Sequence, residues 1–155
     1  MPILAKLKEF LEHNRVAYTV LSHSPAFTAE EVAAAQHVPA RELAKVVIVK
    51  ADDHFLMVVL PALHKVDVQK LPERGARLAT EAELARIFPL CEPGAMPPFG
   101  NLFGLPVYVD HTLAHRDEIV FQAGTHTQTV RMKYADFARL VRPTVEDYTL
   151  ERAGG

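Results

Sequence analysis

Cysteine is nearly absent from the 155-residue sequence, which contains Cys91 alone. A single cysteine cannot form an internal disulfide, and this composition fits a reducing compartment. No neighbouring residue marks Cys91 as an activated thiolate, so we interpret it as an ordinary small residue near a loop. Since 49% of the residues are hydrophobic, the chain can build a core without disulfide or metal staples.

Long apolar runs are also missing. The longest, residues 46–49 and 56–60, are far shorter than the roughly 20 residues that a membrane-spanning helix needs. Near the N-terminus, Lys6, Lys8 and Glu9 interrupt the apolar residues, unlike the continuous apolar segment of a secretory signal. We therefore predict no membrane association and a cytoplasmic location.

An excess of charge of one sign is lacking as well, because the formal net charge is −2. A protein that holds long stretches of nucleic acid by charge needs many clustered Lys and Arg residues, which argues against that class. Brief contact with one nucleic-acid end needs only a local basic face. Six cations in the middle third are candidates for it, with an ordinary solvated surface as the alternative: Lys45, Lys50, Lys65, Lys70, Arg74 and Arg77.

The first third of the sequence carries both helical and strand patterns. Apolar residues at helical spacing predict a helix over residues 2–13, and alternation then predicts a short strand that ends at residues 22–25. Thr28 and Glu31 form a capping box, which predicts a second helix from there to about residue 37.

Two apolar runs rich in β-branched residues, 44–51 and 54–60, follow this helix. Asp52 and Asp53 separate them, as in a tight turn between paired strands. We therefore predict a largely buried hairpin at the centre of the sheet.

The second half begins with a polar helical stretch over 65–71 and a second capping box, Thr80 with Glu83, which opens a helix ending at residue 87. Residues 89–106 are rich in Pro and Gly, which exclude regular structure. A loop this long inside a domain is usually functional or disordered. The remaining predicted elements are strands over 107–110, 118–123 and 127–132 and a helix over 134–141.

This order of elements predicts an α+β domain with a mixed, mostly antiparallel twisted sheet flanked by helices. The sequence shows neither an internal repeat nor a linker. We predict one domain over residues 1–155, with the tail loosely held from about residue 146.

Three segments are candidates for chemistry. Lys45 lies at the mouth of the most apolar predicted strand, where a lysine either snorkels to solvent or serves a site. The loop over 92–100 can present backbone amides to a developing oxyanion, or it is a rigid connector. Residues 124–127, between two strands, can hold an imidazole or an amide over a pocket, or they form a polar hairpin tip.

Together these segments resemble the YbaK and prolyl-tRNA-synthetase-associated editing family. Its members carry a lysine at the start of a central strand, here Lys45, a Gly/Pro-rich loop ending in Pro-x-Gly, here 94–100, and a late glycine element between strands, here 124–126. The resemblance extends over nearly the whole chain. It implies a hydrolase without metal or cofactor that cleaves the ester between an amino acid and the terminal ribose of tRNA. The implied partner is the acceptor end of aminoacyl-tRNA, with a synthetase as a further candidate.

The resemblance also implies which residues form the site. The expected catalytic residues are Lys45, Gly100, Gly124 and His126. The expected substrate-binding residues are Tyr18, Phe27, Thr28, Val46, Pro98, Phe99 and Thr125. Several relatives have a polar residue where this chain has Val46, so the polarity of the pocket and the identity of the amino acid stay open.

The residues present suit this chemistry. An aminoacyl ester is a reactive acyl donor, so an enzyme needs to position water and stabilise the oxyanion, without a covalent nucleophile. We hypothesise that Lys45 anchors or polarises the substrate, that amides around Gly100 or Gly124 receive the oxyanion, and that His126 or a substrate hydroxyl orients water. Small amino acids such as alanine or cysteine, on a proline tRNA, are the expected substrates.

Two other classes of function are alternatives. His111 and His115, beside Asp110, would share one face of a helix and suggest a metal hydrolase, unless they are exposed loop histidines. A module that binds tRNA ends or a synthetase without hydrolysis is the second alternative, and replacing Lys45 by Ala separates it from a deacylase. No Walker-type loop or GxGxxG element supports nucleotide hydrolysis or dinucleotide chemistry.

Overall fold

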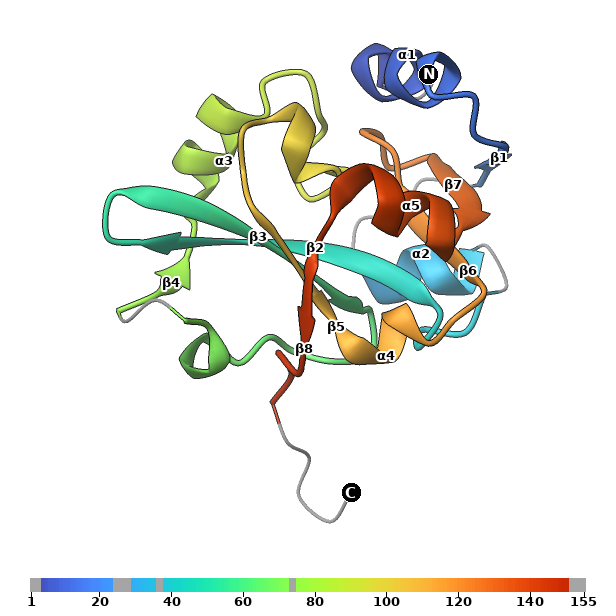
Figure 1. Cartoon of the computed structure of the whole chain (residues 1–155). Helices are drawn as coiled ribbons and strands as arrows, with labels where there is room; N and C mark the ends of the chain where they lie inside the picture. Colours follow the sequence, from blue (N-terminus) through green and yellow to red (C-terminus); the bar gives the residue numbers. More distant parts are fainter. Residues whose placement is uncertain (1–3, 24–28, 36–37, 73–74, 151–155) are drawn as a thin grey trace.

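The computed structural model describes residues 4–23, 29–35, 38–72 and 75–150, which fold around one mixed sheet (Figure 1). Neighbouring strands follow the order β1, β7, β6, β2, β3, β5 and β8, and β4 also pairs with β2. The strands are β1 (Tyr18–Ser22), β2 (Leu43–Ala51), β3 (His54–Pro61), β4 (Arg77–Leu78), β5 (Val107–Asp110), β6 (Glu118–Gln122), β7 (Gln128–Lys133) and β8 (Thr144–Glu146). The helices are α1 (Ala5–His13), α2 (Ala29–Ala35), α3 (Glu81–Ile87), α4 (His111–Ala114) and α5 (Tyr134–Val141).

The strand pairs confirm the predicted α+β class and mixed sheet. The pairs β1–β7, β2–β3, β2–β4 and β6–β7 are antiparallel. The pairs β2–β6, β3–β5 and β5–β8 are parallel. Antiparallel pairs are therefore in the majority, as predicted, but parallel neighbours bring together strands that are far apart in the sequence.

The predicted hairpin is confirmed as the longest strand pair of the sheet. Strands β2 and β3 pair from Ala44 opposite Pro61 to Ala51 opposite His54. Asp52 adopts a positive φ of 52°, a left-handed value that Asp tolerates better than most residues because its short side chain bonds locally. The two-residue Asp turn therefore fixes the register of the central strands.

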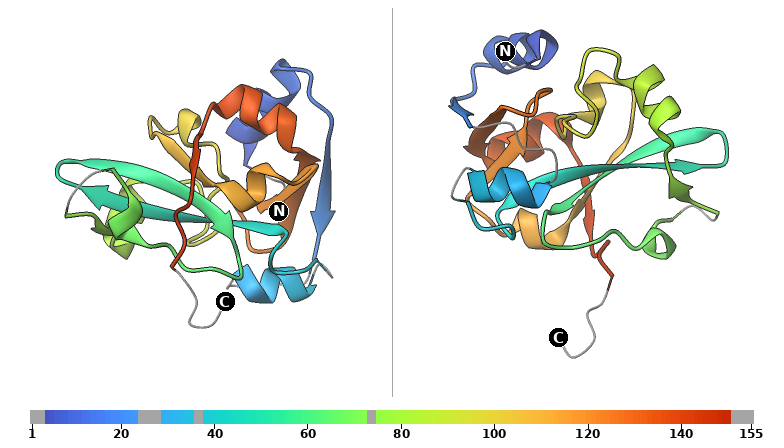
Figure 2. Two further views of the ribbon diagram at one scale, coloured as in Figure 1. Left: turned by 60° about the horizontal axis from the view of Figure 1, so that its bottom comes forward. Right: turned by 180° about the vertical axis from the view of Figure 1, so that it is seen from behind.

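The two faces of the sheet are covered differently. One face forms the large core with α1 and α5, through residues such as Leu7, Leu11 and Phe137. The opposite face carries a smaller core under α2, which includes Val32 and Leu43, and a third cluster next to it. Figures 1 and 2 show α1 and α5 on one side of the sheet and α2 on the other. The side on which a residue of β2 points therefore decides which helix it meets.

The second predicted capping box is confirmed at the start of α3. The Thr80 side chain accepts the N–H of Glu83, and the Glu83 carboxylate accepts the N–H of Thr80 at 2.9 Å. The Arg77 guanidinium, and then the Thr80 amide, hold the pKa of the Glu83 carboxyl well below its ordinary value. Lys50 of β2 lies 3.5 Å from the same carboxylate, which ties α3 to the hairpin. The first predicted box includes Thr28, which lies outside the described residues.

Several elements differ from the predictions. The helix predicted over 65–71 is only a short 3-10 turn, Val68–Lys70, because Asp67 caps it and Leu71 is already extended. Helix α4 and the short strands β4 and β8 were not predicted. Residues 146–150 of the predicted loose tail are anchored, since Tyr148 is 2% exposed and its N–H donates to Asp110 at 2.9 Å.

None of the helices in the described part of the chain has the length and apolar character required to cross a bilayer.

Candidate functional site

A row of polar side chains crosses the face of the sheet that α2 covers. Leu43 of β2 is level with Val120 of β6, and both belong to the core under α2. Side chains alternate between faces along a strand, so Lys45 and Gln122, two residues further along, return to this face. Thr129 of β7 pairs directly with Gln122. The row therefore runs over three neighbouring strands and ends at Lys45.

Two members of the row carry buried polar atoms that lack a partner. Gln122 is 8% exposed and Thr129 is 0% exposed. Neither Nε2 of Gln122 nor Oγ1 of Thr129 makes a hydrogen bond within the described chain. A buried group in this state costs about 1–3 kcal/mol, so it calls for a specific explanation in a native fold. We interpret the row as hydrogen-bonding capacity reserved for a bound molecule.

The same face is hollowed beyond Lys45, in the direction of β4. The groove has a volume of about 380 Å³ and contains two lysines, Lys45 and Lys65, with no carboxylate among its described lining residues. Its other walls are apolar and consist of Val47, Val66, Val68, Leu78 and Leu150. Lys45, which is half-buried, therefore lies between the polar row and a cationic groove with apolar walls.

The turn after β6 is tied to the Gly/Pro-rich loop by backbone hydrogen bonds. The N–H of Gly124 donates to the carbonyl of Ala95, and the N–H of Glu92 donates to the carbonyl of Gly124, both at 2.8 Å. Gly124 has a φ of +104°, and a Cβ there would lie 3.1 Å from Cβ of Leu4. The loop therefore uses the N–H of Gly124 itself and the glycine permits close packing, while the predicted oxyanion role of amides around Gly124 stays a prediction.

Thr125 and His126 bring the polar groups of this turn into the interior, where they are 5% and 6% exposed. The backbone N–H of His126 donates to Oε1 of Glu92 at 3.4 Å. A Cβ on Gly94 would lie 3.9 Å from Cε1 of His126, so the imidazole packs over the loop. The structure therefore holds His126 between the turn and the loop, and its part in the chemistry stays a prediction.

Two predicted substrate-binding residues point to the other face. Tyr18 is level with Met132 of the large core, and its hydroxyl donates to Oε1 of Glu12 at 3.4 Å. Val46 follows Lys45 in β2 and packs against the large core, because adjacent residues of a strand point to opposite faces. Neither side chain therefore lies on the α2 face, and the predicted substrate-binding roles of the two residues stay predictions.

Phe99 and Gly100 belong to the core as well. The Phe99 ring is fully buried, with its centroid 5.3 Å from that of Phe137 and 5.5 Å from that of Phe121. A Cβ on Gly100 would lie 2.6 Å from Cγ2 of Val107, so no larger residue fits. Phe99 therefore packs in the core and Gly100 permits close packing, and the predicted pocket and oxyanion roles of these residues stay predictions.

Three predicted substrate-binding positions remain: Pro98, Phe27 and Thr28. Pro98 is buried, and no contact of this residue distinguishes a binding role from a packing role within the described chain. Phe27 and Thr28 lie outside the described residues. Their predicted roles stay predictions.

The His111 and His115 pair does not form a metal-ligand group by itself. Within the described residues, the group with suitable spacing is Asp110, His111 and Asp147, whose ligand atoms lie within 4.8 Å of one another. Asp110 already accepts the N–H of Tyr148, and Asp147 forms an ion pair with a lysine at 2.9 Å. These contacts assign both carboxylates structural roles.

A larger hollow, of about 520 Å³, lies beside α3 and is lined mainly by apolar side chains such as Leu84, Phe88 and Met96. Cys91 also lines it, and burial raises the pKa of this thiol to about 11. The thiol is therefore protonated near neutral pH and is a poor nucleophile. This hollow lacks the cations and the unpartnered polar atoms found around Lys45.

Sequence reasoning missed three polar residues of the site, Gln122, Thr129 and Glu92. A signal for Gln122 was present, because it interrupts the apolar run Ile-Val-Phe-Gln-Ala of the strand. The pairing of Gln122 with Thr129 depends on the register of β6 and β7, and the contact of Glu92 with the turn depends on the path of the long loop. Neither is encoded in a short motif.

Comparisons with known proteins identify the family of this chain. The model of the aminoacyl-tRNA editing domain family matches residues 23–140. The multifunctional Ser/Thr-tRNA deacylase ProXp-y of Escherichia coli K12 is 26% identical over 152 residues, which cover 92% of this chain and 90% of that protein. The same protein from Escherichia coli O157:H7 matches equally well.

Solved structures show the same fold. Hypothetical protein APE2540 superposes with a TM-score of 0.84 at 20% identity, over 94% of this chain and 99% of that one. A crystal structure provisionally described as a trans-editing enzyme for prolyl tRNA synthetase gives a TM-score of 0.80 at 20% identity, over 94% and 96%. Because the family model spans most of the chain, the protein belongs to the aminoacyl-tRNA editing domain family and is an aminoacyl-tRNA deacylase.

Proposed function

We propose that this chain removes serine or threonine from wrongly charged tRNA, acting in trans on the free aminoacyl-tRNA. The observation that carries the proposal is the row formed by Lys45, Gln122 and Thr129 on the α2 face. The row combines a cation with two buried polar groups that lack partners. It offers one place that can hold both the ester group and the polar side chain of an amino acid attached to tRNA.

The unpartnered atoms favour a substrate with a side-chain hydroxyl. The amide Nε2 of Gln122 is a donor, and the hydroxyl of Thr129 both donates and accepts, so the pair suits a hydroxyl group. An alanine side chain would leave both groups unsatisfied, whereas serine or threonine would pair with them. The similarity to a Ser/Thr-tRNA deacylase supports this choice. We therefore propose hydroxylated amino acids as the substrates, in place of the alanine or cysteine expected from the sequence.

The proposed reaction is direct hydrolysis of the aminoacyl ester. Water attacks the carbonyl carbon, and the electron pair of the C=O bond moves to oxygen. The intermediate then collapses, the bond to the ribose oxygen breaks, and this oxygen takes up a proton that the attacking water has released. The products are the free amino acid and tRNA, and no covalent enzyme intermediate forms.

Lys45 is the proposed source of electrostatic stabilisation. Its ammonium group lies on a half-buried strand position beside the polar row, where a charge acts more strongly than in bulk water. The Gly124 amide is not part of this role, because it donates to Ala95. His126 is the proposed group that orients the attacking water, with the substrate hydroxyl as an alternative.

The decisive experiment measures the release of labelled amino acid from Ser-, Thr-, Ala-, Cys- and Pro-tRNA, with a metal chelator present throughout. The wild type is expected to hydrolyse the Ser or Thr ester fastest. Lys45→Ala is expected to lower kcat/KM by about 100-fold or more, the range seen when one oxyanion-stabilising group is lost. Lys8→Ala, a change at an exposed residue of α1, is the matched control and should retain full activity.

Three results would overturn the proposal. If the folded wild type hydrolyses none of these esters, a module that binds tRNA without hydrolysis becomes the better interpretation. If it hydrolyses Ala-tRNA faster than Ser-tRNA and Thr-tRNA, the polar row does not select the amino acid. If activity appears only in a parallel assay without the chelator, metal chemistry is indicated instead.

A further inference from the structure

The groove beyond Lys45 has a composition that the aminoacyl site does not explain. Lys65 lines it together with four valine and leucine side chains that belong to the hairpin and its flanking segments: Val47, Val66, Val68 and Leu78. Leu78 is 57% exposed, although it is a large apolar residue on a strand of only two residues. An exposed apolar wall beside a lysine suits a ligand that carries both a flat apolar face and a negative charge.

The ion pairs around the groove set Lys65 apart from its neighbours. Lys50 and Arg77 share the carboxylate of Glu83, at 3.5 and 2.9 Å, and Lys70 pairs with Asp147 at 2.9 Å. Within the part of the chain that the structure describes, the side chain of Lys65 makes no ion pair and is exposed. The charge of Lys65 is therefore available to an anion in the groove.

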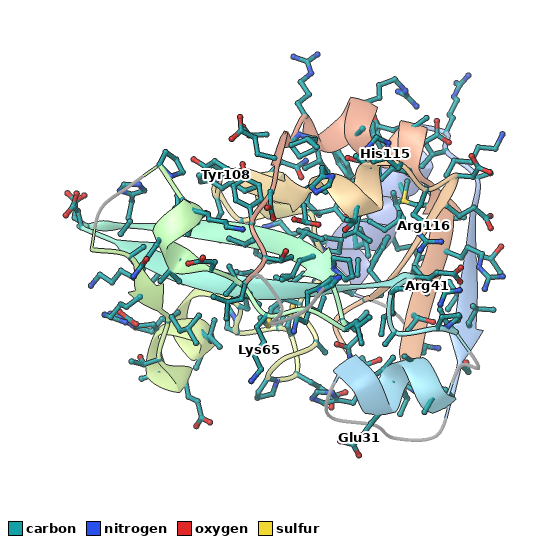
Figure 3. The ribbon with its side chains drawn as sticks, turned by 90° about the horizontal axis from the view of Figure 1, so that it is seen from below. Glu31, Arg41, Lys65, Tyr108, His115 and Arg116 are labelled. Carbon is teal, nitrogen blue, oxygen red and sulfur yellow. The ribbon has the colours of Figure 1, made fainter. Side chains whose placement is uncertain are left out.

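The surrounding surface also distinguishes the groove as a site for an anion. Figure 3 shows Lys65 projecting outward near α2, apart from Arg41 and Arg116. Arg116 forms an ion pair with Glu42 at 3.2 Å, and its neighbourhood also includes Asp117 and Glu118. That second region is therefore mixed in charge, whereas the groove has lysines and no carboxylate among its described residues.

We infer that the groove binds the single-stranded 3′ end of the tRNA, with a base against the apolar wall and a backbone phosphate at Lys65. This inference rests on the proposed function, because the aminoacyl group must lie on the polar row for the chain end to enter the groove. Lys45 then lies at the junction of the two. Apolar contact with bases and lysine contact with phosphates are how proteins hold single strands without reading their sequence.

The test is a binding measurement that needs no hydrolysis. Fluorescence anisotropy compares two labelled RNA hairpins that imitate an acceptor stem, one with a single-stranded 3′ CCA tail and one with a blunt end. Lys65→Glu is expected to weaken binding of the tailed RNA at least about fivefold and to lower the salt slope by about 0.7, the value for one single-strand phosphate. Lys65→Arg should bind as the wild type does.

Two controls test whether weaker RNA binding is specific to the groove. They exclude a general effect of surface charge and a general effect of surface hydrophobicity. Lys8→Glu makes the same charge change on α1 and should leave binding unchanged. Leu78→Ser should weaken binding of the tailed RNA, whereas Leu90→Ser, at a residue that is 79% exposed outside the groove, should not. Blunt RNA should bind all variants alike.

The outcomes distinguish this inference from the proposed function. If Lys65→Glu binds the tailed RNA as tightly as the wild type, or weakens tailed and blunt RNA equally, the inference is wrong even when Ser-tRNA is hydrolysed. The same holds if the wild type does not prefer the tailed RNA. If the tail binds through Lys65 but no ester is hydrolysed, the groove is confirmed and the deacylation proposal fails.

Discussion

The two faces of the central sheet differ in composition, although the same strands form both. On the face covered by α1 and α5, the rings of Phe99, Phe121 and Phe137 pack against one another in a large, mainly apolar core. The hydroxyl of Tyr134 in this core is also buried without a hydrogen-bond partner in the described chain. On the face covered by α2, Gln122 and Thr129 are buried with unpartnered polar atoms. Alternation along a strand allows this, because adjacent residues such as Phe121 and Gln122 point to opposite sides.

Within a single strand, residues on one face should therefore contribute mainly to stability and residues on the other face mainly to function. A closely packed apolar face supplies the free energy of folding, while an unsatisfied polar face lowers it and keeps binding groups available. Changes on the first face should therefore mainly affect unfolding, and changes on the second should mainly affect substrate choice.

The largest expected effect is on the packed face. Phe99→Ala removes a fully buried ring and should lower the free energy of unfolding by about 3–5 kcal/mol. Urea denaturation measures this loss. Phe103→Ala, at a half-buried ring that packs on Phe88, is the control and should cost less. Equal losses in the two variants would show that Phe99 is not central to the core.

Gly124→Ala tests the junction between the two faces. The positive φ and the approach of Leu4 to 3.1 Å should together cost about 1–3 kcal/mol of unfolding free energy. Gly75→Ala is the control, because Gly75 also has a positive φ but no atom lies within 4 Å of its added Cβ. The thermal midpoint should fall further for Gly124→Ala. If both variants fall equally, the contact with Leu4 contributes nothing.

A pair of exchanges in β7 sharpens the comparison. Thr129→Val removes the unpartnered hydroxyl and should leave stability unchanged or raise it by up to about 1 kcal/mol, while the Ser-over-Ala ratio of kcat/KM falls about tenfold. Val130→Thr places a hydroxyl on the packed face and should destabilise by about 1–3 kcal/mol. Denaturation curves and deacylation rates check both changes. Clear destabilisation by Thr129→Val would contradict our interpretation that this hydroxyl forms its hydrogen bond with the substrate and not within the folded chain.

The smallest expected effect lies outside both faces, at the cap of α3. Hydrogen bonds from Arg77 and then from the Thr80 amide keep the pKa of Glu83 below its ordinary value of 4.5. The unfolded chain therefore binds this proton more readily, so the stabilisation is present above about 4.5 and is lost as the pH falls below it. Glu83→Gln should lose less stability on acidification than the wild type, as measured by the thermal midpoint. Parallel pH curves would contradict this assignment.

Local patterns in the sequence predicted the elements whose causes are local. The β2–β3 hairpin depends on two adjacent runs and an Asp turn, and the α3 cap depends on Thr80 and Glu83. The site depends on the parallel pairing of β2 with β6, which places Lys45 level with a strand far along the chain. No periodicity reports such a neighbour, so Gln122 was missed.

A glycine in the sequence is an ambiguous signal of a site for a physical reason. A glycine near a site and a glycine in a crowded core give the same sequence signal, since both need the absence of a Cβ. Gly100 and Gly124 serve close packing against Val107 and Leu4. The sequence signal at Lys45 is less ambiguous, because a cation in an apolar strand has few structural uses, and its catalytic role stays a prediction.

The placement of β8 has a consequence for synthesis of the protein. This strand pairs in parallel with β5, and the segment that follows it supplies the backbone donor for the carboxylate of Asp110, which is fully buried. Residues 144–148 leave the ribosome after every strand of the sheet that they complete. Until they emerge, β5 keeps an open edge and Asp110 lacks one of its donors. The nascent chain therefore covers the edge of β5 with the short strand β8 in a late step, and a stalled chain that ends before β8 would present the edge of β5 to other chains.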